Sequence, residues 1–333
     1  MTTENNGLFT VEETATFINE GQSLLISGDE TLLQQLPKGN WIGGTMHYFM
    51  SSDGGIVVKD KLFINFLDDR VKPALIKAYG PEEMDSIVDD YPASGVSFII
   101  IPALSACWKK YSTDTCFKPE ILQSPLVGWI SGVIYEEIGK ETPKVINGKT
   151  GELHDNQCIL MHCELAENVA AVPNILNIFD PGSGDVLEFD EETTEVKDVI
   201  VNGVKRNFYD YLKEIGATLQ EPLMTDYAGA KINTSFFSLN DENKVVNVWS
   251  PVLPGYEYKI PSPIANYEEK FGEELEKLNI EPLFACNCLY NFFYGQLEGK
   301  KTGRVVGPMT FGEIAYLYLN QTMVYLTLEE TAA

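Results

Sequence analysis

The sequence predicts an α+β protein made of two lobes, with mixed or antiparallel β-sheets flanked by α-helices. Segments with the pattern of strands and hairpins outnumber those with the pattern of helices, and simple alternation of strand and helix is absent. Two Asn-Gly pairs between β-type residues, Asn147-Gly148 and Asn202-Gly203, suit the type I′ turns of hairpins. A chain of 333 residues is too long for a typical single core, so we expect lobes at residues 1–200 and 201–333.

The first lobe is expected to mix short helices with strands. Pro81 and the acidic residues after it are typical of the first turn of a helix. The run 96–101 is continuously β-branched or aromatic, which predicts a fully buried strand. In order, we expect helices at 11–19, 29–35 and 81–88, and strands at 24–26, 40–50, 56–66 and 96–101.

The second lobe repeats this mixture after the hairpin at Asn202-Gly203. Asn207 is placed to cap a helix that ends at Gly216. Residues 265–278 have the apolar spacing of a helix, and 282–294 form an apolar run. Further strands are expected at 245–249 and 323–328.

The charge of the chain excludes one class of partner. Acidic residues outnumber basic ones 49 to 24, for a net charge of -25, and such a surface repels the phosphates of nucleic acids. The N-terminus is polar and acidic, unlike a signal peptide, and the most apolar stretch, Gly95–Leu104, is too short to span a membrane. We therefore expect a cytoplasmic protein that binds neither nucleic acid nor membranes, with its six cysteines mostly reduced.

Common enzyme motifs are absent, which favours a non-catalytic protein. The sequence has no Gly-rich phosphate loop, no Gly-x-Ser-x-Gly elbow and no His-Glu-x-x-His helix. A cysteine nucleophile paired with His47, His154 or His162 remains an alternative, as in a cysteine-dependent hydrolase or transferase. The apolar surroundings of Cys286 should instead raise the pKa of its thiol and make it inert.

A zinc site is the metal centre that the sequence suggests most directly. Cys158, His162 and Cys163 lie close together, and Cys286 and Cys288 would supply the other half. One residue between the last two cysteines is too few for the usual zinc knuckle. Buried free cysteines behave as small hydrophobic residues, so we favour packing and predict no bound metal.

The segment around Gly43-Gly44 has two interpretations. Glycine weakens a strand unless the backbone bends or something approaches it closely. Thr45, His47 and Tyr48 follow, and these side chains can bond to a ligand or stack on it. A bulge between two strands is the alternative, and the sequence leaves both open.

The last apolar segment contains a polar cluster. Glu313 follows Gly312 and is placed where a carboxylate could face a cavity, and Asn320, Gln321 and Thr322 offer donors and acceptors. Buried polar groups without partners cost about 1 to 3 kcal/mol each, so something must satisfy these. Backbone, water and a bound small molecule are the candidates.

Six segments, taken in order, resemble the FIST domain family (F-box and intracellular signal transduction). The C-terminal pair is the most specific, since that family closes on Gly-Glu-Ile, Asn-Gln-Thr and a final strand. One departure concerns the arginine that the family usually carries three residues after its late cysteine, a place held here by Leu289 or Asn291. The matching segments are Ile42–Thr45, Asp198–Gly203 leading into Phe208–Leu212, Val252–Tyr256, Leu283–Cys288, Thr310–Ile314 and Asn320–Thr322.

The resemblance implies a FIST-like fold and a sensory protein that binds a small ligand, such as an amino acid, between its lobes. We expect the signal to pass to a partner protein, because the chain carries no output domain, and we leave open assembly into a homo-oligomer. Some family members are associated with haem, so a haem sensor with His47 or His162 as ligand is a second hypothesis, and a structural or scaffolding protein is a further one. The expected ligand-binding residues are Gly43, Gly44, Thr45, His47, Cys288, Glu313, Asn320 and Thr322.

Overall fold

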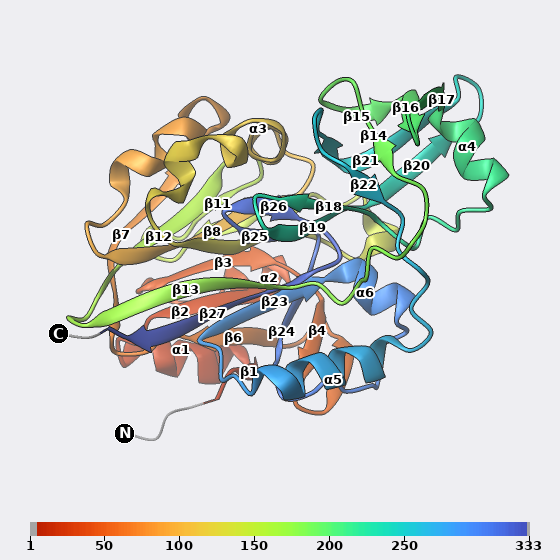
Figure 1. The fold of residues 1–333 in the computed structure, drawn as a ribbon. Coiled ribbons are helices and arrows are strands. Elements are labelled where there is room, and N and C mark those ends of the chain that lie inside the picture. The colour runs from red at the N-terminus through yellow and green to blue at the C-terminus, as the bar shows by residue number, and fades with distance from the viewer. Residues whose placement is uncertain (1–4, 332–333) are drawn as a thin grey trace.

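Two layers of β-sheet packed face to face, with helices on both outer surfaces, form the body of the protein (Figure 1). The structure is a computed structural model that describes residues 5–331. Its sheets contain both antiparallel and parallel pairs, and helices are not interleaved regularly with strands. The α+β class predicted from the sequence is therefore confirmed.

The first layer is a mixed sheet covered by α3 (Ala106–Thr113). Its central strands β8 and β9 are parallel, and its other neighbours are antiparallel. Alternate residues of β8 face opposite ways, so Ile100 packs between the layers while Ile99 packs under α3. Its strands, in spatial order, are β26 (Leu317–Leu319), β25 (Glu313–Ala315), β9 (Leu126–Ser131), β8 (Gly95–Pro102), β12 (Cys158–Leu165) and β7 (Val71–Tyr79).

The second layer consists of two sheets, covered by α1 (Val11–Asn19) and α5 (Tyr267–Leu278). One has the order β1 (Gly7–Phe9), β6 (Leu62–Phe66), β2 (Leu24–Gly28), β3 (Trp41–Thr45), β10 (Val145–Asn147) and β11 (Glu152–His154). The other has the order β13 (Val169–Leu176), β27 (Met323–Glu330), β23 (Phe284–Cys288), β24 (Gly307–Thr310), β4 (Tyr48–Ser51) and β5 (Gly54–Val57).

The helices begin where the sequence supplies capping residues. Thr10 and Glu13 form a reciprocal capping box at α1, and the Asp29 carboxylate caps α2 (Glu30–Leu33). The predicted helix after Pro81 is a 3₁₀ helix, η1 (Pro81–Asp90). Within residues 5–331, no helix is long and apolar enough to cross a membrane. The remaining short helices are η2 (Thr115–Phe117), η3 (Pro119–Gln123), η4 (Tyr135–Glu137) and α6 (Leu289–Tyr294).

Residues 187–259 form a side module with its own apolar core, and its hairpin at 223–234 lies against the body (Figure 1). Helix α4 (Phe208–Glu214) begins at Asn207, whose side chain accepts a hydrogen bond from the Asp210 backbone, as predicted. One sheet holds β17 (Val204–Asn207), β16 (Asp198–Val201), β14 (Leu187–Glu188), β22 (Tyr258–Lys259), β18 (Leu223–Tyr227) and β19 (Ala230–Thr234). The other holds β15 (Thr193–Val196), β21 (Val245–Val252) and β20 (Phe236–Asn240).

The two Asn-Gly pairs behave differently. Asn202 and Gly203 both have positive φ and join β16 to β17, which confirms the predicted tight hairpin. Asn147-Gly148 also lies in a hairpin, between β10 and β11, but a two-residue turn was the wrong prediction, because four residues connect the strands. Gly148 is needed there for space, since a Cβ atom would lie 2.2 Å from the carbonyl oxygen of Trp41.

Strands from beyond residue 200 pair with strands that precede it. In the body, β27 pairs with β13, β25 with β9, and β24 with β4. Residue 200 itself lies in β16, inside a hairpin of the side module. The predicted division into lobes at this residue stays a prediction.

Candidate functional site

Glu313 is a fully buried carboxyl group at the start of β25. Its Oε2 atom accepts hydrogen bonds from the Thr322 hydroxyl at 2.9 Å and the Thr322 backbone N–H at 3.2 Å. Its Oε1 atom has no partner among the described residues. Burial raises the pKa of Glu313 well above its ordinary value, and the bonds from Thr322 oppose that rise only in part. Burial therefore favours the neutral form of the Glu313 carboxyl group over the charged form.

The polar residues after Glu313 are satisfied largely by the side module. The Asn320 Oδ1 atom accepts from the Ser250 hydroxyl at 3.3 Å. The Gln321 side chain accepts from the Ser235 hydroxyl at 2.6 Å and donates to the Gln220 carbonyl at 2.7 Å. The sequence left backbone, water and a bound small molecule as possible partners for these polar groups. In the structure, the protein's own backbone and side chains supply the hydrogen bonds. The cluster thereby joins the side module to the body.

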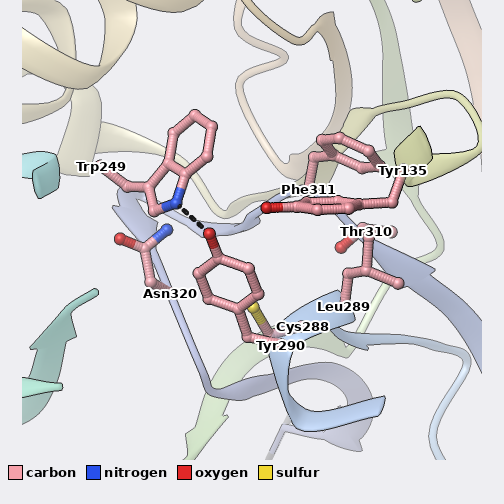
Figure 2. Close-up of a pocket in the computed structure, with 8 residues that line it drawn as sticks. All are labelled: Tyr135, Trp249, Cys288, Leu289, Tyr290, Thr310, Phe311 and Asn320. Atoms are coloured by element: carbon pink, nitrogen blue, oxygen red, sulfur yellow. Dashed lines mark hydrogen bonds between the residues drawn. The ribbon is translucent and has the colours of Figure 1, made fainter. Parts of the chain in front are cut away.

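A small enclosed cavity lies beside this cluster (Figure 2). Cys288 and Asn320 line it, and its volume of about 20 Å³ holds one water-sized particle. The indole N–H of Trp249 donates to the Tyr290 hydroxyl at 2.8 Å, so the two aromatic side chains close one side. Two of the predicted ligand-binding residues therefore line a cavity that is too small for an amino acid.

Gly43 and Gly44 lie in β3, where neighbouring protein atoms fill the space next to them. A Cβ atom on Gly44 would lie 2.8 Å from the Ile100 side chain of the first layer, and one on Gly43 would lie 3.0 Å from the Ile26 carbonyl oxygen. Gly44 therefore allows the two layers to pack closely, whereas Gly43 lies against β2 of its own sheet. Thr45, which follows, bonds to the backbone of Lys144.

A larger, open groove lies next to the enclosed cavity. Its volume is about 660 Å³. Tyr48 of β4 and Phe292 and Phe293 of α6 supply its aromatic lining. The other lining residues are Val57, Ile134, Glu136, Gln296, Glu298 and Lys300. Tyr48 was predicted to be able to stack on a ligand, but it is not among the expected ligand-binding residues.

Tyr135 of η4 lies between the two hollows. It lines the enclosed cavity, while its neighbours Ile134 and Glu136 line the groove. The Tyr135 backbone N–H donates to the Tyr48 hydroxyl at 3.0 Å, and its ring meets that of Phe293 edge to face at 5.3 Å. A change in the position of η4 would therefore alter both hollows.

The comparison with protein families corrects the resemblance drawn from the sequence. The match is to DUF6976, a family of unknown function, and covers residues 9–329. The chain belongs to this family. The FIST resemblance is therefore wrong; the segments behind it were short, and most of them were weak when taken singly. No curated protein and no solved structure matches the chain.

The histidines proposed as haem ligands in this DUF6976 chain are buried. The Nε2–H of His47 donates to the Asp29 carboxylate at 3.1 Å, and burial lowers the pKa of His47 despite that carboxylate. Both ring nitrogens of His162 are hydrogen-bonded, one to Ser97 at 2.8 Å and one to Tyr79 at 2.9 Å. Burial lowers the pKa of His162 to about 4. The bonds of His162 leave it no free nitrogen for iron.

The six cysteines of this DUF6976 member are free thiols, and all are buried. Burial raises the pKa of the Cys286 and Cys288 thiols well above the ordinary value, which suppresses the reactive thiolate. Among residues 5–331, no group of three or more histidine, cysteine or acidic side chains is placed to hold a metal ion. These observations favour neither a thiol nucleophile nor the zinc site considered above.

Proposed function

We propose that this DUF6976 protein is a non-catalytic small-molecule-binding protein, with its ligand in the open groove over Tyr48, Phe292 and Phe293. The observation that carries the proposal is the groove itself. Its volume of about 660 Å³ falls in the range typical of ligand sites, and aromatic rings from segments far apart in the chain line it. The enclosed cavity holds water in this proposal, not the ligand.

The proposal includes a cytoplasmic location and signalling through a partner protein. Six buried, unpaired thiols support the location, since reducing compartments preserve free cysteines. The position of η4 between groove and cavity supports a sensory role. A ligand that moves Tyr135 would disturb the contact between Trp249 of the side module and Tyr290 of the body. The position of the side module relative to the body would then change.

A ligand screen with a matched pair of variants tests the proposal. Thermal-shift measurements against amino acids, amines and other metabolites should find compounds that raise the melting temperature, because a ligand that binds only the folded state stabilises it. Calorimetry should then show that Phe293→Ala weakens binding about tenfold, since it removes one ring of the groove.

Leu122→Ala is the control, because Leu122 is an exposed apolar side chain of η3 that does not line the groove. It should bind the same ligands as the wild-type protein. A screen without any stabilising compound, or equal affinity in wild type and Phe293→Ala, would contradict the proposal.

A further inference from the structure

We propose that the groove selects small organic cations, in which an ammonium group is carried on a compact apolar body. This inference rests on the proposed function, and it adds the chemical class of the ligand. Three features of the groove carry it: the mutual orientation of the aromatic rings, the carboxylates at the rim, and the charge of the surrounding surface.

The three rings stand at steep angles to one another. Tyr48 and Phe293 are 5.4 Å apart at 86°, Tyr48 and Phe292 are 5.7 Å apart at 68°, and Phe292 and Phe293 are 6.1 Å apart at 76°. Phe293 is partly exposed, whereas Tyr48 and Phe292 are only 3% and 4% exposed, so a flat ligand cannot stack on all three rings. A rounded ammonium group needs no single stacking plane, and the negative faces of aromatic rings attract it.

The rim of the groove carries more negative than positive charge. Glu136 and Glu298 both line it, against a single cation, Lys300. Among the described residues, neither glutamate takes part in a salt bridge, so both carboxylates are available to a ligand. The Lys300 ammonium group is directed in part to the Gly295 carbonyl oxygen, at 3.4 Å.

Other charges around the groove also favour the binding of a cation over that of an anion. Lys59, the next cation along this face, is already paired with Glu137 at 3.0 Å. Burial raises the pKa of the Tyr48 hydroxyl, and the carboxylates of Glu136 and Glu137 raise it further, so their field reaches the aromatic lining. With a net charge of -25 on the whole chain, the surface attracts cations and repels anions on approach.

Two pairs of compounds, equal in shape and different in charge, test the inference. The first is choline and dimethylbutanol, in which carbon replaces the charged nitrogen, and the second is phenethylamine and phenethyl alcohol. Calorimetry with the full chain should give an affinity about tenfold higher for each cation than for its neutral counterpart. Raising the salt concentration should weaken the binding of the cations and leave the binding of the neutral compounds unchanged.

The double variant Glu136→Gln and Glu298→Gln should lower the affinity for both cations about tenfold and leave the neutral compounds unchanged. Glu120→Gln is the matched control, because Glu120 is an exposed acid of η3 outside the groove. This control variant should bind the cations as the wild-type protein does.

The outcomes separate the two proposals. Equal binding of charged and neutral partners, or ligands from the wider screen that are all neutral or anionic and depend on Phe293, would overturn the cation inference and leave small-molecule binding intact. Failure of both cations to bind at millimolar concentration also overturns the inference. Failure of every compound in the wider screen would remove the proposed function as well.

Discussion

Glu313 shows how far a single side chain depends on its surroundings. In the sequence it follows a glycine and precedes a polar triplet, so a ligand-binding carboxylate was a reasonable expectation. In the fold it lies in the interior, where water does not reach it, and the neutral form is favoured over the charged one. A neutral carboxyl group attracts a cationic ligand only weakly. We therefore propose the carboxylates of the groove, and not Glu313, as the contacts for a cation.

The protonation of Glu313 predicts a pH-dependent stability. The folded protein keeps a proton that the unfolded chain releases above its ordinary pKa of 4.5, so the free energy of unfolding falls as the pH rises above that value. Glu313→Gln retains an acceptor for Thr322 and has no such proton. Its stability relative to the wild-type protein should therefore rise between about pH 5 and about pH 8, as measured by urea unfolding.

Glu313→Ala provides the comparison for this experiment. It removes the acceptor of both bonds from Thr322 and should lower the free energy of unfolding by about 1 to 3 kcal/mol. A constant difference between Glu313→Gln and wild type across the pH range would show that Glu313 is charged in the folded protein.

The residues of the groove illustrate why part of the site escaped prediction. Phe292 and Phe293 lie in an apolar run, and the aromatic residues of such a run are more often core than ligand-binding. Nothing local distinguishes a ring that lines a groove from one that fills a core. Cys288 and Asn320, which were expected to bind a ligand, line the small cavity and not the groove, and their role in binding stays a prediction.

At the scale of elements, β3 determines how closely the two layers approach. Gly44 faces Ile100 of β8 and Ser131 of β9, and the contact leaves no room for a side chain. Both interpretations of Gly43-Gly44 raised by the sequence, a ligand approach and a bulge, differ from this packing role. The approaching group is a β-strand of the same chain, and sequence alone does not reveal which distant strand faces which.

A pair of glycine substitutions tests this role of β3. Gly44→Ala should lower the free energy of unfolding by about 1 to 3 kcal/mol, because it overpacks the interface between the layers. Gly272, inside helix α5, has open space around it. Gly272→Ala should instead raise the free energy of unfolding by about 0.5 to 1 kcal/mol, since alanine favours the helix.

Denaturant unfolding of both glycine variants gives the measurement. If the two substitutions change the free energy of unfolding equally, the space beside Gly44 does not limit how closely the layers pack. A stable Gly44→Ala protein that has lost only ligand binding would restore the interpretation of Gly44 as a ligand contact.

Elements with a strong local signal were predicted well, and those shaped by long-range packing were not. The helix at Val11–Asn19 matches the prediction, because its caps and apolar spacing are local. The run 56–66 was predicted as one strand but contains the end of β5 and all of β6, which belong to different sheets of the second layer. The apolar run 282–294 contains strand β23 and helix α6, a boundary that periodicity does not mark.

At the scale of the whole molecule, the last strand joins the middle of the sequence to its C-terminal part. β27 lies between β13 and β23, and its residues Val324 and Leu326 belong to the core between the layers, whereas Met323 and Tyr325 belong to a second apolar cluster. Without the segment after residue 200, strands β13, β9 and β4 would each lose a partner. The stability of the body therefore depends on contacts between residues far apart in the chain.

A fragment experiment tests this dependence and the predicted boundary together. Residues 1–200 expressed alone should give neither cooperative thermal unfolding nor dispersed amide signals, because exposed apolar strand faces and unpaired edges remain. Mixing this fragment with residues 201–333 should restore the transition in part. A fragment 1–200 that unfolds cooperatively by itself would instead support the division into two lobes.

The sequence by itself determined the class of the protein, its strongly acidic surface, several helix boundaries and the Asn202-Gly203 hairpin. Each of these depends on composition or on neighbours within a few residues. Tertiary structure alone decided that burial favours the neutral form of Glu313, that Gly44 packs against the opposite layer, and that Tyr48 meets Phe292 and Phe293 at a groove. Burial and contact depend on strands brought together from distant parts of the chain, and local sequence patterns carry no record of that pairing.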